Sequence, residues 1–187
     1  MADKTQFTGS FILAPVPVVL IGCSHEELGR NVLTLAWCGV ACSDPPTVSI
    51  SIRPERHSYR MIEESRCFTV NIPTVDLVRA VDICGNLSGS GGDKFEAAGL
   101  TAAPSTIVEA PLVAECPVIL ECAVKNIYPA GVHHVFWGEV VARHADPFVL
   151  TGGKLDFSKI PLLTYVNGEY WSLGRPVGTS GFSQQGR

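Results

Sequence analysis

Short runs of β-branched, aliphatic and aromatic residues, separated by turn residues, recur along most of the chain. At residues 47–53 apolar and polar residues alternate strictly, so one face of a strand would join a core and the other would carry hydroxyl groups. Seven runs of this kind predict a mainly β fold, either a barrel or a sandwich. The predicted strands span residues 16–22, 31–41, 47–53, 67–72, 118–128, 134–143 and 163–172.

Helical patterns are short and lie between the predicted strands. They cover residues 58–64, 76–83 and 94–98, and the last is followed by a glycine, a common helix terminator. No internal repeat, charged linker or low-complexity block divides the chain, and 187 residues are typical of one domain. We therefore predict a single domain over residues 1–187. Its tail, residues 174–187, has the composition of an arm that is mobile or packs on a partner.

The composition favours self-association and argues against a polyanionic partner. Hydrophobic residues make up 46% of the chain and charged residues 17%, with a mean hydropathy of +0.23, so little charge is available to cover the surface. We therefore expect an oligomer. The net charge is −4 and the isoelectric point is about 5.7, without any run of Lys or Arg, so nucleic-acid binding is not expected.

The seven cysteines suggest neither a disulfide framework nor a metal site. Their number is odd, and residues such as Cys38 and Cys122 lie in apolar runs, which is typical of buried thiols in a reducing cytoplasm. Cys38 and Cys42 are four residues apart rather than three, and His133 and His134 would point to opposite faces of a strand. No metal is therefore expected. Redox activity of a thiol stays open, because it requires exposure and a lowered pKa.

The apolar run FILAPVPVVLIGC near the start of the chain has the look of a bacterial lipoprotein signal. Pro15 and Pro17 interrupt the hydrophobic region, however, and Asp3 cancels the charge of Lys4 in what should be a positive leader. We interpret the run as a strand that starts at a proline. No apolar stretch approaches the roughly 18 residues that cross a bilayer, so we expect a cytoplasmic protein without a membrane partner.

Common nucleotide and hydrolase motifs do not fit this chain. The stretch GSGGDK at residues 89–94 ends in a lysine where the dinucleotide-binding fingerprint requires a glycine, and it lacks the Gly-Lys-Ser/Thr of a P-loop. The serines at 88, 90 and 180 do not have the Gly-x-Ser-x-Gly spacing of a hydrolase elbow. Neither a nucleotide-binding fold of these types nor seryl hydrolysis is indicated.

The stretch DPPTVSISIRPERHSY, residues 44–59, leads from the alternating strand into a cluster of anion-binding groups. A proline ends the strand, and we expect His57 or Ser58 to cap the helix that follows. Free backbone N–H groups at the start of this helix would then lie near Arg53 and Arg56. Such an arrangement suits a phosphate group.

A purely structural interpretation of the same stretch is equally open. In it, Arg56 pairs with Glu63 or Glu64, and Ser58 only caps the helix. The residue pattern of this stretch alone does not decide between the two interpretations.

Four segments together point to a family. They are NVLTLAWCGVACSDPPTVSISIRPERHSYRMIEESRCFTVNIP at 31–73, CGNLSGSGGDKFEAAGLT at 84–101, HHVFWGEVV at 133–141, and LLTYVNGEYWSLGRPVGTSGFS near the C-terminus. In sequence and in order they resemble the flavin reductase-like, FMN-binding split-barrel family, which includes flavoredoxins and flavin-dependent ferric reductases. The resemblance covers nearly the whole chain. It implies a split β-barrel with a few short peripheral helices.

The resemblance also implies a cofactor, a partner and site residues. FMN would lie in a groove at the interface of a homodimer, with its phosphate held by Arg56 and Ser58. Ser51 and Arg53 would line the approach to the phosphate, and Lys94 would add a cation near the cofactor. The edge of the isoalloxazine ring would follow Thr34, Ala36, Trp37 and Cys38, whose backbone amides can bond polar ring atoms. His134 resembles a histidine that faces the flavin in some members.

Three of these residues have alternative interpretations. Lys94 would otherwise be a solvated lysine before a short helix, because exposed lysines are the rule. His134 would otherwise be a half-buried strand residue with an unrelated hydrogen-bond partner. Trp37 would otherwise belong to the core, with its indole N–H bonded to one partner.

Three functions are compatible with this resemblance. The first is an NAD(P)H-dependent reductase of flavin or ferric iron, and the second is a flavoredoxin-like carrier that receives electrons from a small redox protein. The third is an FMN-binding or interaction module without redox activity. Because a flavin itself accepts a hydride and releases single electrons, no catalytic acid, base or nucleophile is expected among the side chains.

Overall fold

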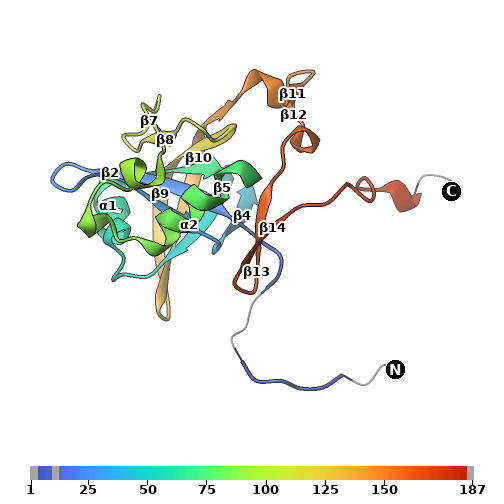
Figure 1. Cartoon of the computed structure of the whole chain (residues 1–187), viewed down its shortest axis with the longest axis horizontal. Helices are drawn as coiled ribbons and strands as arrows, with labels where there is room; N and C mark the ends of the chain where they lie inside the picture. Colours follow the sequence, from blue (N-terminus) through green and yellow to red (C-terminus); the bar gives the residue numbers. More distant parts are fainter. Residues whose placement is uncertain (1–3, 10–12, 185–187) are drawn as a thin grey trace.

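The computed structural model describes residues 4–9 and 13–184. It confirms the predicted mainly β fold with short helices (Figure 1). The strands are β1 (Val16–Pro17), β2 (Val19–His25), β3 (Gly29–Leu35), β4 (Cys38–Ser43), β5 (Pro46–Ile52), β6 (Cys67–Ile72), β7 (Ala102–Ala103), β8 (Leu112–Val113), β9 (Val118–Ala130), β10 (His133–Ala145), β11 (Leu150–Thr151), β12 (Lys154–Leu155), β13 (Leu163–Val166) and β14 (Glu169–Ser172). The α-helices are α1 (His57–Ser65), α2 (Val78–Asn86) and α3 (Lys94–Ala98).

Seven strands form the main sheet, in the order β3-β2-β6-β9-β10-β5-β4, with every neighbouring pair antiparallel. The two edge strands, β3 and β4, follow each other in the sequence and are joined only by Ala36 and Trp37. Three peptide steps of 3.8 Å span at most about 11 Å, so the two edges of the sheet must approach each other at this connection. The sheet therefore curls into a barrel whose edges meet at one end.

The continuous apolar run of β2 arises because this strand of the main sheet is buried on both faces. In β2, Ile21 packs in one cluster with Phe68 and Phe136, while the adjacent Leu20 packs in a second cluster with Val81 of α2 and Phe95 of α3. Residues from α1 join the first cluster. Because both faces of β2 are covered, its sequence lacks the alternation seen in β5.

Three predicted strands are each divided in the structure. The run at 16–22 contains β1 and β2, which belong to different sheets, and the run at 31–41 bends at Ala36 and Trp37 between the two sheet edges. The run at 163–172 folds into the hairpin β13–β14. Its two-residue turn has positive φ angles at Asn167 (47°) and Gly168 (98°), as expected for an Asn-Gly turn between paired strands.

The predicted helices are confirmed with small changes. The predicted helix at 94–98 has the bounds of α3, and that at 58–64 is one residue longer at each end as α1. The helix predicted at 76–83 consists of a 3₁₀ turn, Val75–Leu77, followed by α2, which extends to Asn86. Among the described residues, no helix is both long enough and apolar enough to cross a bilayer.

A buried carboxylate anchors the loop that precedes β8. Glu121 on β9 is 0% exposed, and it accepts hydrogen bonds from the backbone N–H groups of Thr106, Ile107 and Val108 at 2.7–2.9 Å. His144 on β10 lies 2.7 Å from the same carboxylate. Burial acts to raise the pKa of Glu121, but the bonds from Thr106 and its neighbours outweigh burial and lower the pKa to about 2.

We predict that Glu121→Gln destabilises the fold. The carboxylate form is favoured above the ordinary pKa of 4.5 and loses its contribution as the pH falls towards about 2. A shift of this size corresponds to stabilisation on the order of 3 kcal/mol at pH 7. Urea unfolding at pH 7 should show a loss of this order for Glu121→Gln, and the difference from wild type should shrink below pH 4. Exposed Glu26 provides a control, because Glu26→Gln should change stability by less than about 0.5 kcal/mol. Equal stability of wild type and Glu121→Gln would contradict the anchor.

Candidate functional site

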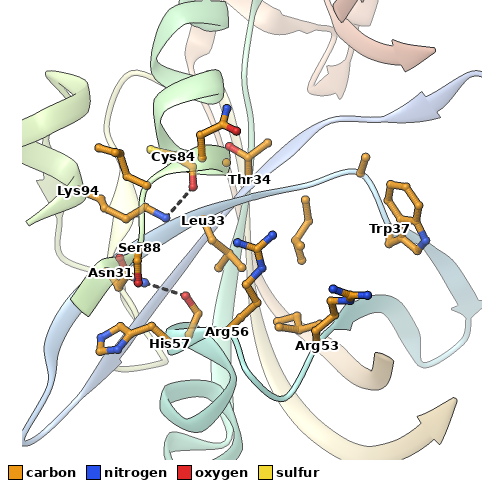
Figure 2. A pocket seen from close by; sticks show the side chains of 18 of the residues that line it. Asn31, Leu33, Thr34, Trp37, Arg53, Arg56, His57, Cys84, Ser88 and Lys94 are labelled. Carbon is orange, nitrogen blue, oxygen red and sulfur yellow. Dashed lines mark hydrogen bonds between the residues drawn. The ribbon is translucent and has the colours of Figure 1, made fainter. Parts of the chain in front are cut away.

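The main pocket lies where the two edges of the sheet approach each other. Its volume is about 670 Å³, within the range of small-molecule sites. It is lined by the end of β3 and the Ala36–Trp37 connection, and by the end of α2 and segment 87–89, which pack against β3. The end of β5 and the start of α1 contribute residues 51–58, and Tyr165 and Tyr170 come from the β13–β14 hairpin. Figure 2 shows the arrangement.

The start of α1 presents free backbone donors to this pocket. Arg56 is the N-cap residue, and no side chain caps the helix, so the prediction that His57 or Ser58 would be the cap is wrong. The chain turns just before the helix, with the N–H of Arg56 donating to the carbonyl of Arg53 at 3.0 Å. Within the described residues, the N–H groups of His57 and Ser58 have no partner, because the first N–H groups of a helix lack a preceding turn.

Arg56 lines the pocket, and its guanidinium points into it (Figure 2). The alternative pairing with Glu63 or Glu64 does not occur. Glu64 accepts a 2.7 Å bond from Arg60, and Glu63 accepts a 2.9 Å bond from the hydroxyl of Tyr59. No carboxylate pairs with Arg56 in the described part of the chain. An unpaired guanidinium beside a helix N-terminus is suited to an anion.

Lys94 supplies a second cation, and it is not solvated. Its side chain lines the pocket and is 3% exposed, so the solvated alternative is wrong. The ammonium donates a 2.6 Å bond to the carbonyl of Cys84. Burial lowers the pKa of Lys94, and the nearby charge of Arg56 lowers it further. An ammonium has three N–H donors, so an anionic or hydroxyl-bearing ligand would add to this single bond.

The opposite end of the pocket carries the bend between β3 and β4. Trp37 is 49% exposed and lies nearly parallel to His133, with 6.4 Å between ring centroids and 8° between planes. The core interpretation of Trp37 is therefore wrong. Thr34 and Ala36 also line the pocket, and the hydroxyl of Thr34 donates to the carbonyl of Val81 in α2. These contacts hold α2 against β3.

Two more of the predicted residues lie on the approach to the pocket. Ser51 lines it, and its backbone N–H donates to the carbonyl of Trp37 at 2.9 Å, which joins β5 to the bend. Arg53 lines the rim and pairs with Glu55 at 3.3 Å. Ser58 lies deeper and is buried, and its hydroxyl oxygen accepts a 2.7 Å bond from Asn31.

Cys38 and His134 are not among the residues that line this pocket. Cys38 packs against the cluster inside the barrel. His134 lies with its Nδ1 2.8 Å from the hydroxyl of Tyr59, whereas the preceding His133 lines the pocket. Successive side chains of a strand point to opposite faces, so only one of the two histidines can face the cavity.

The sequence did not indicate several of the residues that line the pocket. Asn31 and Leu33 come from β3, whose alternation was hidden in an apolar run that is buried on both sides. The end of α2 and the segment that follows it matched no known phosphate motif. The hairpin tyrosines are distant in sequence from the other lining residues, and only an Asn-Gly turn signal marks their position. The missed residues are Val18, Asn31, Leu33, Leu35, Ile52, Glu55, His57, Cys84, Gly85, Asn86, Leu87, Ser88, Gly89, His133, Tyr165 and Tyr170.

The cysteine side chains are thiols, and potential metal ligands do not cluster within the described residues. All seven cysteines are free. Burial raises the pKa of Cys84, which lines the pocket, and of Cys38, each to about 11, so both are protonated at neutral pH. Residues 4–9 and 13–184 contain no group of three or more His, Cys, Asp or Glu side chains that could hold a metal ion.

The family model for the flavin reductase like domain matches residues 12–174. The chain belongs to this family. A protein of Archaeoglobus fulgidus is 34% identical over 147 residues, which are 78% of this chain and 81% of the relative. Among solved structures, flavoredoxin of Desulfovibrio vulgaris is 30% identical with a TM-score of 0.90, and it covers 98% of this chain and 100% of its own. Flavoredoxin from Methanosarcina acetivorans is 26% identical with a TM-score of 0.92, covering 98% of both chains.

These similarities confirm the predicted flavin reductase-like family and its split-barrel fold. The family is named for flavin chemistry, which agrees with the predicted cofactor class.

Proposed function

We propose that this protein is an FMN-binding oxidoreductase and that the pocket holds the flavin. The observation that carries the proposal is the unpaired guanidinium of Arg56 beside the free N–H groups at the start of α1. A phosphate dianion fits this donor set, because it accepts several charge-assisted bonds. Ser58 and the cation of Lys94 complete the polar end of the site.

The other end of the pocket suits the planar ring of a flavin. Thr34 and the bend formed by Ala36 and Trp37 line the cavity, and backbone amides at this end would bond polar atoms of the ring. Ser51 and Arg53 line the entrance. Bound FMN would supply hydride and single-electron transfer, while these residues bind and orient it. Tyr165 and Tyr170 of the β13–β14 hairpin also line the cavity.

The first candidate is a reductase that takes electrons from NAD(P)H and passes them to flavin or ferric iron. A carrier that receives electrons from a small redox protein is the second candidate. It is favoured by the similarity to two flavoredoxins and by the absence of a separate nicotinamide fingerprint in the sequence. An FMN-binding module without redox activity is the third.

Anaerobic mixing of the flavin-loaded protein with NADH or NADPH distinguishes these candidates. For a reductase, the visible absorbance of the flavin should bleach on mixing, since a hydride reaches the ring. For a carrier, the absorbance should persist with NAD(P)H and bleach only when a reduced ferredoxin-type protein is added. Persistence with every donor would leave only the binding module and would contradict the oxidoreductase proposal.

We further propose a homodimer whose partner completes the entrance to each site. Support comes from large apolar side chains that the main sheet leaves exposed: Trp137 and Tyr128 contact each other with 5.9 Å between ring centroids and remain partly exposed, and Val40 of edge strand β4 is 85% exposed. Sedimentation should give about twice the chain mass of 20.0 kDa. A monomer that binds FMN tightly would contradict the shared site.

We also propose that the protein works in the cytoplasm. The free thiols support this location, and cell fractionation would test it.

Arg56→Ala should separate a phosphate contact from a structural role. Loss of a charge-assisted bond of about 1.5–3 kcal/mol should weaken FMN binding about ten- to a hundredfold. Riboflavin has the same ring without the phosphate, so its affinity should hardly change. The measurement is a pair of fluorescence titrations at equal salt, with Arg79→Ala on the exposed face of α2 as the matched control. Equal weakening of FMN and riboflavin would overturn the phosphate assignment.

A further inference from the structure

Lys94 is a buried cation without a carboxylate partner in the described part of the chain. Its side chain is 3% exposed, yet it belongs to none of the ion pairs found there. The preceding carboxylate, Asp93, is engaged elsewhere, because it accepts bonds from Arg30 at 2.7 Å and from the backbone N–H of Phe95 at 2.8 Å. Lysines are almost never fully buried unless they are paired. This one therefore indicates a ligand or a reaction.

The ammonium of Lys94 has more donors than the protein around it uses. It carries three N–H donors, and within the described residues it donates one bond, at 2.6 Å, to the carbonyl of Cys84 (Figure 2). Two donors remain for the pocket that the side chain lines. A buried donor without an acceptor costs free energy. The cost is removed when a ligand accepts these bonds or when the two N–H groups are lost in a reaction.

The surroundings of Lys94 favour its neutral amine. Burial lowers the pKa of Lys94, and the charge of Arg56 lowers it further. Two thiols, Cys84 and Cys23, lie near the ammonium, but burial raises their pKa values to about 11 and about 12, so both are protonated at neutral pH. Neither thiol therefore offers a compensating negative charge. A neutral lysine amine in a desolvated site is a nucleophile that condenses with carbonyl groups.

A group that binds anions lies beside this amine. Arg56 lines the same pocket, and Figure 2 shows it in the middle of the cavity, with Lys94 on one side and Trp37 on the other. A molecule that reaches from Lys94 to Arg56 would carry an electrophilic carbon at one end and an anion at the other. A phosphorylated aldehyde combines these two groups, because its phosphate accepts charge-assisted bonds and its carbonyl carbon reacts with an amine.

We propose that Lys94 condenses with phosphorylated aldehydes to form a Schiff base. The amine nitrogen adds to the aldehyde carbon, a carbon–nitrogen double bond forms, and the carbonyl oxygen leaves as water with two hydrogens of the ammonium. The protonated Schiff base keeps one N–H. That number matches the one acceptor, the Cys84 carbonyl, which the described protein provides. Arg56 and the N–H groups at the start of α1 hold the phosphate.

The reaction goes beyond the proposed flavin function, although it uses a part of the same pocket. Formation of the Schiff base requires an empty pocket and no flavin. Since the phosphates of the aldehyde and of FMN would both contact Arg56, the two ligands should exclude each other. This competition alone rests on the proposed function.

Pyridoxal 5′-phosphate is a suitable probe, because borohydride adds a hydride to the imine carbon and fixes the Schiff base as a secondary amine. After the flavin-free protein is mixed with the probe and reduced, mass spectrometry of peptides should find one label per chain, on Lys94. Pyridoxal lacks the phosphate, so its apparent affinity for this site should be about tenfold lower or weaker still. A label spread over the exposed lysines, Lys125, Lys154 and Lys159, without preference for Lys94 would overturn the proposal.

Two substitutions separate the amine from the phosphate contact. Lys94→Arg keeps the positive charge but cannot form the Schiff base, so the single label should disappear, whereas the control Lys154→Arg should leave it in place. Arg56→Ala should weaken labelling by pyridoxal 5′-phosphate about tenfold or more and leave labelling by pyridoxal unchanged. Equal weakening with both probes would contradict the phosphate contact. The site of the label in the wild-type protein decides the proposal even if Lys94→Arg does not fold.

Addition of FMN distinguishes this proposal from the proposed function. FMN should protect Lys94 from the probe over the concentrations at which FMN binds. Binding of FMN to a protein whose Lys94 is never labelled would overturn the Schiff base and leave the flavin site. Labelling of Lys94 in a protein that binds no FMN would do the reverse. Labelling that continues with FMN bound would overturn the assignment of both phosphates to Arg56.

Discussion

The short connection between β3 and β4 is the constraint on which the rest of the structure depends. These strands form opposite edges of a seven-stranded sheet, yet only Ala36 and Trp37 join them. The sheet can satisfy this connection only by curling until its edges approach each other. The same closure brings the end of β3 next to the end of β5 and the start of α1, which are the elements that line the pocket. The candidate site is thus a consequence of how the barrel closes.

The charges in the pocket follow from this geometry. Arg56 extends from the turn after β5, and Lys94 reaches the same cavity from α3, where the ion pair between Arg30 and Asp93 fixes the helix on β3. Burial lowers the pKa of Lys94, and the charge of Arg56 lowers it further. An anion in the pocket would favour the charged form of Lys94 and would also accept bonds from Arg56 and the start of α1.

The local pattern of apolar and polar residues predicted β5 and the short helices, because these elements depend on residues that are close in the sequence. The same pattern did not predict features that depend on contacts between segments far apart in the sequence. The position of Trp37 between two sheet edges depends on the strand order of the whole sheet, and the burial of Lys94 results from packing of α3 on β3. Alternation places His133 and His134 on opposite faces but does not tell which one faces the pocket. Asn31 was missed because its strand is covered on both sides.

The central claim is that the pocket binds FMN, and the visible absorption spectrum tests it most directly. The purified protein, or the protein titrated with FMN, should show flavin bands that differ from those of free FMN and should saturate at one FMN per chain. Absence of flavin bands after purification, together with no spectral change during titration with FMN, would contradict the account.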